Sequence, residues 1–76
     1  VTIPSGVTSI GTYAFQNCYG LGAIHLRPVA PPTVASANAW TSLPTDCTIY
    51  VPAGTLGDYT SAGNYPSSAT YTYVEE

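Results

Sequence analysis

The chain has 76 residues, enough for one small domain, and its 45% hydrophobic content argues against a disordered segment. Only 7% of the residues are charged, and the net charge of −3 comes from one Arg against four acidic residues. A surface without clustered Lys and Arg is unsuited to nucleic-acid phosphates or anionic membranes, and no apolar run approaches the ~18 residues of a membrane span.

The polar surface must therefore be supplied by Ser, Thr, Asn and Tyr, a composition more typical of extracellular than of cytosolic surfaces. The opening residues "VTIP" include no Met and show no signal-peptide pattern. We expect a mature chain or a fragment of a longer protein.

Three short strands are predicted along the chain, and proline follows each of them directly or after one residue. The first covers residues 1–3, the second residues 24–26 and the third residues 49–51. Between the first two strands, apolar residues recur at steps of three to four from Ile10 to Leu21. This spacing predicts a curved return segment that leads into the strict alternation of the second strand.

The second and third strands belong to two copies of one pattern, which read "AFQNCYGLGAIHLRP" and "AWTSLPTDCTIYVPA". Phe15 aligns with Trp40 and Leu26 with Val51 without a gap, a step of 25 residues, and Ile3 precedes Leu26 by 23 residues. A period near 23 lies within the range of about 20–29 residues found in leucine-rich repeats.

We therefore expect a repeat solenoid: leucine-rich-repeat-like coils with short parallel strands, irregular or short helical return segments, and a C-terminal cap. Residues 1–23 form repeat 1, residues 24–48 form a degenerate repeat 2, and residues 49–76 form a terminal strand and the cap. Asp46 stands where the aligned first copy has Leu21, so the second coil should be locally irregular.

Side chains alternate across a strand, so each predicted strand divides into inward and outward residues. The aromatic pair Phe15 and Trp40 should stack in successive coils. The expected structural core comprises Ile3, Ile10, Phe15, Cys18, Leu21, Ile24, Leu26, Trp40, Leu43, Ile49 and Val51.

The outward residues Thr2, His25 and Tyr50, joined by Arg27, form the candidate binding face. The continuous strand face of a solenoid is its usual recognition surface, and aromatic and Arg side chains dominate binding hot spots. The alternative interpretation is that they are ordinary outward strand residues.

The stretch "TIPSGVTSIGTYAFQNCYGLGAIHL" resembles the BspA-type leucine-rich repeat, whose units read approximately T-I-P-x-x-V-x-x-I-G-x-x-A-F-x-x-C-x-x-L-x-x-I-x-I. The matching positions are Val7, Ile10, Gly11, Ala14, Phe15, Cys18, Leu21 and Ile24. Residues 28–48 resemble a degenerate last repeat, and "TIYVPAGTLGDY" resembles a terminal segment that closes such arrays. The resemblance implies a bacterial surface or secreted protein whose repeats act in adhesion and binding.

The last third of the chain is predicted to cover the end of the array. A helix of one or two turns should follow Pro52, with Leu56, Tyr59 and Ala62 on one side, and "TYTYV" alternates like a final strand. No corresponding cover is predicted at the N-terminal face, where Val1 begins within a strand. We expect that face to contact upstream repeats of the same chain or other copies of the protein.

The sequence contains no set of residues that completes a catalytic or metal site, so we expect a non-enzymatic protein without cofactor or metal. A triad using His25 and Asp46 lacks a nucleophile motif, and two cysteines with one His are too few for a structural zinc. Cys18 and Cys47 are interpreted as buried thiols, while a disulfide between them stays an open alternative.

These sequence features are consistent with two functions. The first is a binding or adhesion module at the C-terminal end of an extracellular or cell-surface leucine-rich-repeat protein, with a protein or a surface glycan as ligand. The second is a structural subunit that self-associates head-to-tail through its open N-terminal face into a filament or ring.

Overall fold

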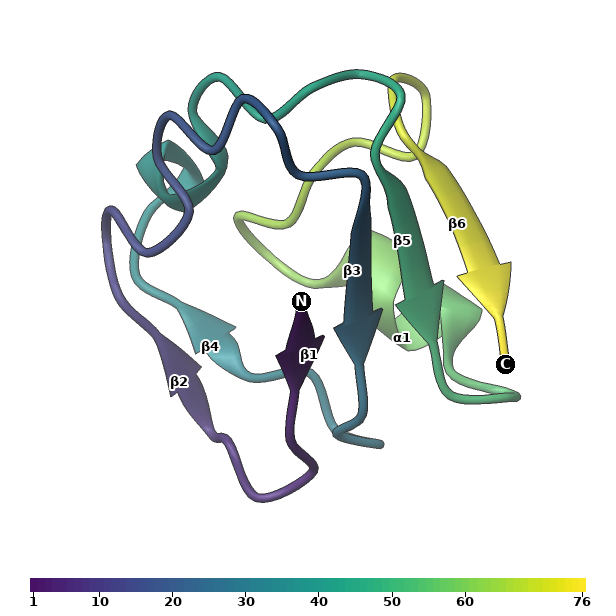
Figure 1. Ribbon diagram of the computed structural model, residues 1–76. Helices are drawn as coiled ribbons and strands as arrows, with labels where there is room; N and C mark the ends of the chain where they lie inside the picture. The colour runs from purple at the N-terminus through teal and green to yellow at the C-terminus, as the bar shows by residue number, and fades with distance from the viewer.

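The computed structural model describes residues 1–76, and its main element is a sheet of four parallel strands (Figure 1). These strands are β1 (Thr2–Ile3), β3 (Ala23–Leu26), β5 (Thr48–Val51) and β6 (Thr72–Glu75), in the order β1-β3-β5-β6. The sequence-based expectation of short parallel strands with little helix is confirmed.

A second, smaller parallel ladder joins β2 (Ser9–Ile10) to β4 (Thr33–Val34). The helical content is one 3-10 turn, η1 (Ala37–Trp40), and one short α-helix, α1 (Leu56–Ser61). No helix of the structure is long and apolar enough to cross a bilayer.

The register of the large sheet follows the 23- and 25-residue steps seen in the sequence. Ile3 pairs with Leu26, and Ile24 pairs with Ile49. Both β3 and β5 alternate between half-buried and buried residues, because successive side chains of a strand point to opposite faces of the sheet. The fully covered face belongs to the core, and the other face carries the candidate binding residues.

The segments opposite the large sheet are linked by backbone hydrogen bonds as well as by β2 and β4. The amide of Phe15 donates to the carbonyl of Ala39 at 2.9 Å, and the amide of Asn17 donates to that of Thr41 at 2.9 Å. Asn17 also takes a left-handed backbone conformation with φ 61°, and Ser42, its partner in the sequence alignment, has φ 67°. The two return segments therefore share a backbone turn as well as a hydrophobic pattern.

The core lies between the large sheet and these return segments. Most residues expected there are buried: Ile3, Ile10, Ile24, Leu26, Trp40, Leu43, Ile49 and Val51. Phe15, Cys18 and Leu21 are only partly buried. The Phe15 and Trp40 rings stack with their centroids 5.1 Å apart and their planes inclined by 6°. The core is completed by residues outside the expected set: Val34, Ala39, Cys47 and Tyr59.

The last third of the chain covers the core with tyrosines. Tyr59 on α1 is 0% exposed and donates its hydroxyl hydrogen bond to the carbonyl of Pro28. Tyr65 donates to Pro32 at 2.7 Å, and its ring meets that of Tyr59 edge-on at 5.4 Å. The helical spacing predicts Leu56 on the inward side with Tyr59, but Leu56 stands at the first position of α1 and is 37% exposed.

Candidate binding face

One row of side chains crosses the exposed side of the large sheet. Strand register aligns Thr2 with His25, His25 with Tyr50, and Tyr50 with Val74. We call these four residues the outer row. In β3 and β5 the residues on either side of this row are buried, so the sheet itself orients the row toward solvent. Three of the four residues expected on the binding face thus lie in one line, and Val74 extends it.

His25 and Tyr50 form a stacked pair within the outer row. Their ring centroids are 4.5 Å apart and their planes differ by 5°. Adjacent strands lie about 4.8 Å apart, which is close to the spacing that stacked rings prefer. Each ring covers one face of the other, and each keeps one outer face.

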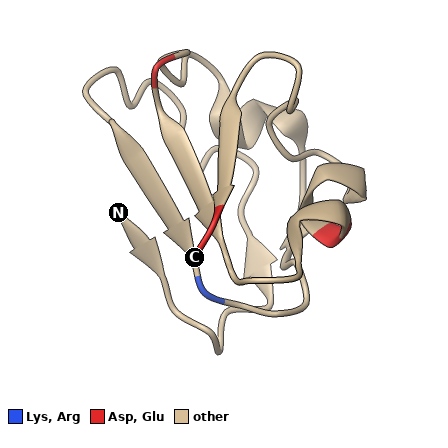
Figure 2. Ribbon diagram, turned by 90° about the vertical axis from the view of Figure 1, so that its right-hand side faces the viewer, with Lys and Arg blue, Asp and Glu red and all other residues tan.

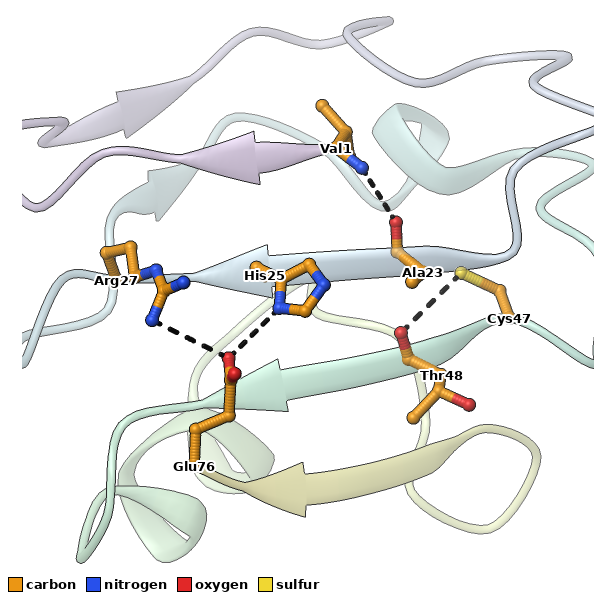
Figure 3. A network of polar contacts seen from close by, with 7 residues as sticks. All are labelled: Val1, Ala23, His25, Arg27, Cys47, Thr48 and Glu76. Carbon is orange, nitrogen blue, oxygen red and sulfur yellow. Dashed lines mark hydrogen bonds and ion pairs between the residues drawn. The ribbon is translucent and has the colours of Figure 1, made fainter.

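Glu76, which follows β6, joins this face (Figure 3). Its backbone amide donates to the carbonyl of Val51 at 2.8 Å, which holds the residue beside the sheet. Its Oε1 lies 3.0 Å from His25 Nδ1 and 3.8 Å from the Arg27 guanidinium. Arg27, the fourth residue expected on the binding face, is therefore beside His25, at the end of β3.

Glu76 is not among the residues that the sequence pattern predicts at this face. A signal for it was present in the strict alternation of the final strand, which, continued for three residues beyond Tyr73, places Glu76 on the side opposite that tyrosine. What the alternation could not supply was the pairing of β6 with β5, which brings Glu76 across the sheet toward β3.

Arg27 is the only Lys or Arg in the chain, so this face holds its only strongly basic side chain. Figure 2 shows this single basic position next to the end of β6 and its acidic residues. The other carboxylates, Asp46 and Asp58, belong to a turn and to α1 and make no ion pair. An anion that approaches the protein therefore meets a specific attractive group mainly at this face.

The side chains at this face do not form the hydrogen-bonded set of a nucleophilic site. No hydroxyl or thiol hydrogen-bonds to the His25 imidazole, and its carboxylate partner is Glu76 rather than Asp46. No group of three or more His, Cys, Asp or Glu side chains could hold a metal ion. Cys18 and Cys47 are both free thiols, and burial raises the pKa of the Cys47 thiol.

A separate apolar hollow of about 300 Å³ lies beside β1. Strand β1 pairs with β3 on one side only, so its other edge is free. The apolar lining of the hollow is formed by Val1, Ile3, Val7, Ile10, Ala14 and Phe15. This is the N-terminal face for which the sequence predicts contact with further repeats or with other copies.

Comparison of the chain with protein-family models, curated proteins and solved structures finds no match. The function proposed below therefore rests on the geometry of the two surfaces described above.

Proposed function

We propose that the protein is a non-enzymatic binding or adhesion module that holds its ligand at the outer row and Arg27. The observation that carries this proposal is the in-register line of Thr2, His25 and Tyr50 with the chain's only Arg beside it. Stacked aromatic groups lose little conformational freedom on binding because they are already ordered. Tyr and Arg are also the side chains most enriched in binding hot spots.

We further propose that the module is the C-terminal end of a leucine-rich-repeat solenoid of the BspA type, in a bacterial surface or secreted protein. Three features support this proposal: the 23- and 25-residue steps between paired strands, the Phe15–Trp40 stack, and the matched left-handed turns at Asn17 and Ser42. Each is what successive coils of one repeat would share. The tyrosine-rich last third would then serve as the cap.

The binding proposal is tested by attachment of protein-coated beads to a panel of extracellular-matrix proteins and surface glycans. The variant His25→Ala/Tyr50→Ala should lose attachment and stay folded, with a melting temperature lowered only by the loss of the ring stack and of the contact with Glu76. The matched control Tyr13→Ala/Tyr19→Ala removes two exposed rings from the return segment and should attach normally. Wild-type beads that attach to nothing, or an outer-row variant that attaches like wild type, would contradict the proposal.

A second function is favoured by the hollow beside β1: head-to-tail association of copies into a filament or ring. Both edges of the large sheet are free, β1 at one side and β6 at the other, and both strands run in parallel. A β6 edge docked on β1 of the next copy would continue the sheet and cover the hollow.

Light scattering over a range of concentrations tests this association. Growth of the assembly with concentration, abolished by Val7→Asp in the hollow, would support it. A wild-type protein that stays monomeric at every concentration would exclude it.

A further inference from the structure

The His25, Arg27 and Glu76 cluster indicates which ligand chemistry the outer face would accept. A carboxylate oxygen already lies there, 3.0 Å from His25 Nδ1 and 3.8 Å from the Arg27 guanidinium. The position of Glu76 thus marks a place where a carboxylate meets both cationic or potentially cationic side chains of the chain.

The guanidinium of Arg27 is left with unused hydrogen-bonding capacity. The 3.8 Å between Arg27 Nη1 and Glu76 Oε1 allows an ion pair but is longer than the about 2.7–3.2 Å of a hydrogen bond. No hydrogen bond within the molecule involves this side chain, which is 51% exposed. Guanidinium carries a planar fork of N–H donors that matches a carboxylate in a two-bond arrangement. Arg27 can therefore take a second carboxylate from outside.

Glu76 both marks this site and competes for it. Its carboxylate lowers the local positive potential and occupies His25 Nδ1. Exposed ion pairs of this kind are weak, so an incoming carboxylate can displace Glu76 at little cost. Removing the Glu76 charge should then strengthen binding of an external anion.

We propose that the outer face binds a glutamate-containing, extended polypeptide segment, with Arg27 as the main contact and Glu76 as a built-in competitor. This proposal rests on the binding function above and assigns its ligand class. A polypeptide is favoured over an acidic glycan because the carboxylate observed at the site is that of a Glu that directly follows an extended strand.

Fluorescence anisotropy with a labelled short oligoglutamate peptide provides the test, with an oligoglutamine peptide and a hyaluronan oligosaccharide as comparison ligands. Glu76→Gln should bind oligoglutamate about three- to fivefold more tightly than wild type, the range set by a surface ion pair. Arg27→Gln should bind it about tenfold more weakly. Asp58→Asn is the matched control, because it removes the same charge from α1 and should change affinity by less than about twofold.

Each result supports or overturns the proposal. Equal gains in oligoglutamate affinity from Glu76→Gln and Asp58→Asn would show only an effect of net charge and overturn the role of Glu76. An Arg27→Gln protein that binds oligoglutamate like wild type would show that Arg27 is not the main contact. Tighter binding of hyaluronan than of oligoglutamate would show that the site prefers an acidic glycan and would overturn the assignment of a peptide ligand. If no variant binds oligoglutamate while the outer-row variant still loses bead attachment, the ligand class is wrong and the binding function stands.

Discussion

The hydroxyl of Tyr59 provides the sharpest test of how the last third of the chain is held. Tyr59→Phe removes one oxygen atom from a side chain that is 0% exposed and leaves the ring in place. The lost hydrogen bond joins α1 to Pro28, which is itself buried, and no other hydrogen bond outside the helices and strands ends on that carbonyl. The variant therefore leaves a buried acceptor unsatisfied.

An unsatisfied buried group costs about 1–3 kcal/mol, so the expected loss in the free energy of unfolding is ~2 kcal/mol. A domain of this size has a total stability of roughly 4–11 kcal/mol, and 1 kcal/mol shifts its melting temperature by about 4–8 °C. Tyr59→Phe should therefore melt roughly 8–16 °C below wild type, as measured by circular dichroism and checked by urea unfolding.

Tyr13→Phe is the matched control, because it removes the same atom from a ring that is 61% exposed and whose hydroxyl makes no hydrogen bond. It should change stability by less than about 0.5 kcal/mol. A Tyr59→Phe protein as stable as this control would refute the claim that the buried hydroxyl holds α1 to the segment after β3.

Three further predictions concern tyrosine ionisation, thiol reactivity and backbone strain. Burial raises the pKa of Tyr73 to about 12 and also raises that of Tyr65 above the ordinary value near 10. The stability that the neutral phenols contribute below pH ~10 should therefore fall as the pH rises toward 12. Tyrosinate absorbance and circular dichroism, recorded together, measure this loss. Cys47, which is 1% exposed with a thiol pKa raised by burial, should react with a disulfide reagent only on unfolding, whereas the partly buried Cys18 should react in the native protein. Ser42→Asn should stabilise the fold by about 0.5 kcal/mol in urea unfolding, because Asn tolerates the left-handed φ of 67° better than Ser.

Each of these predictions has a result that would contradict it. Ionisation of all seven tyrosines near pH 10 without loss of structure would show that Tyr65 and Tyr73 are not held by the fold. Equal native reaction rates of the two thiols would contradict the burial of Cys47. For the strain prediction the control is Thr45→Asn, an exposed turn position outside the left-handed region, which should leave stability unchanged. A Ser42→Asn protein no more stable than this control would contradict the prediction.

Much of the large sheet could be predicted from the sequence because its strands are short, end at proline and repeat one hydrophobic pattern. Ile24 and Leu26 share spacing with Ile49 and Val51, and matching spacing is enough to set the register of two parallel strands. The outward position of His25 and Tyr50 follows from the same alternation. Their stacking at 4.5 Å then needs only the ordinary distance between neighbouring strands.

Other features depend on contacts between segments that the pattern does not link. The sequence predicts that Cys18 and Cys47 are both buried, but only Cys47 is fully buried, because the turn at Asp46 brings it against the core. The helical spacing predicts Tyr59 on the inward side of a short helix, but its hydrogen bond to Pro28 depends on how α1 packs beside β6. Phe15 is only partly buried, since the hollow beside β1 leaves one side of it uncovered.

Several local properties of this protein follow from its sequence alone: where the strands of the large sheet lie, which of their side chains alternate inward and outward, and that Arg27 is its only strongly basic residue. Each of these depends on near neighbours or on composition. Tertiary packing was needed to bring Glu76 onto His25 and near Arg27, from 51 and 49 residues away along the chain. That contact arises because β6 pairs with β5, and the pairing of two strand edges is settled by the packing of the whole sheet rather than by either segment alone.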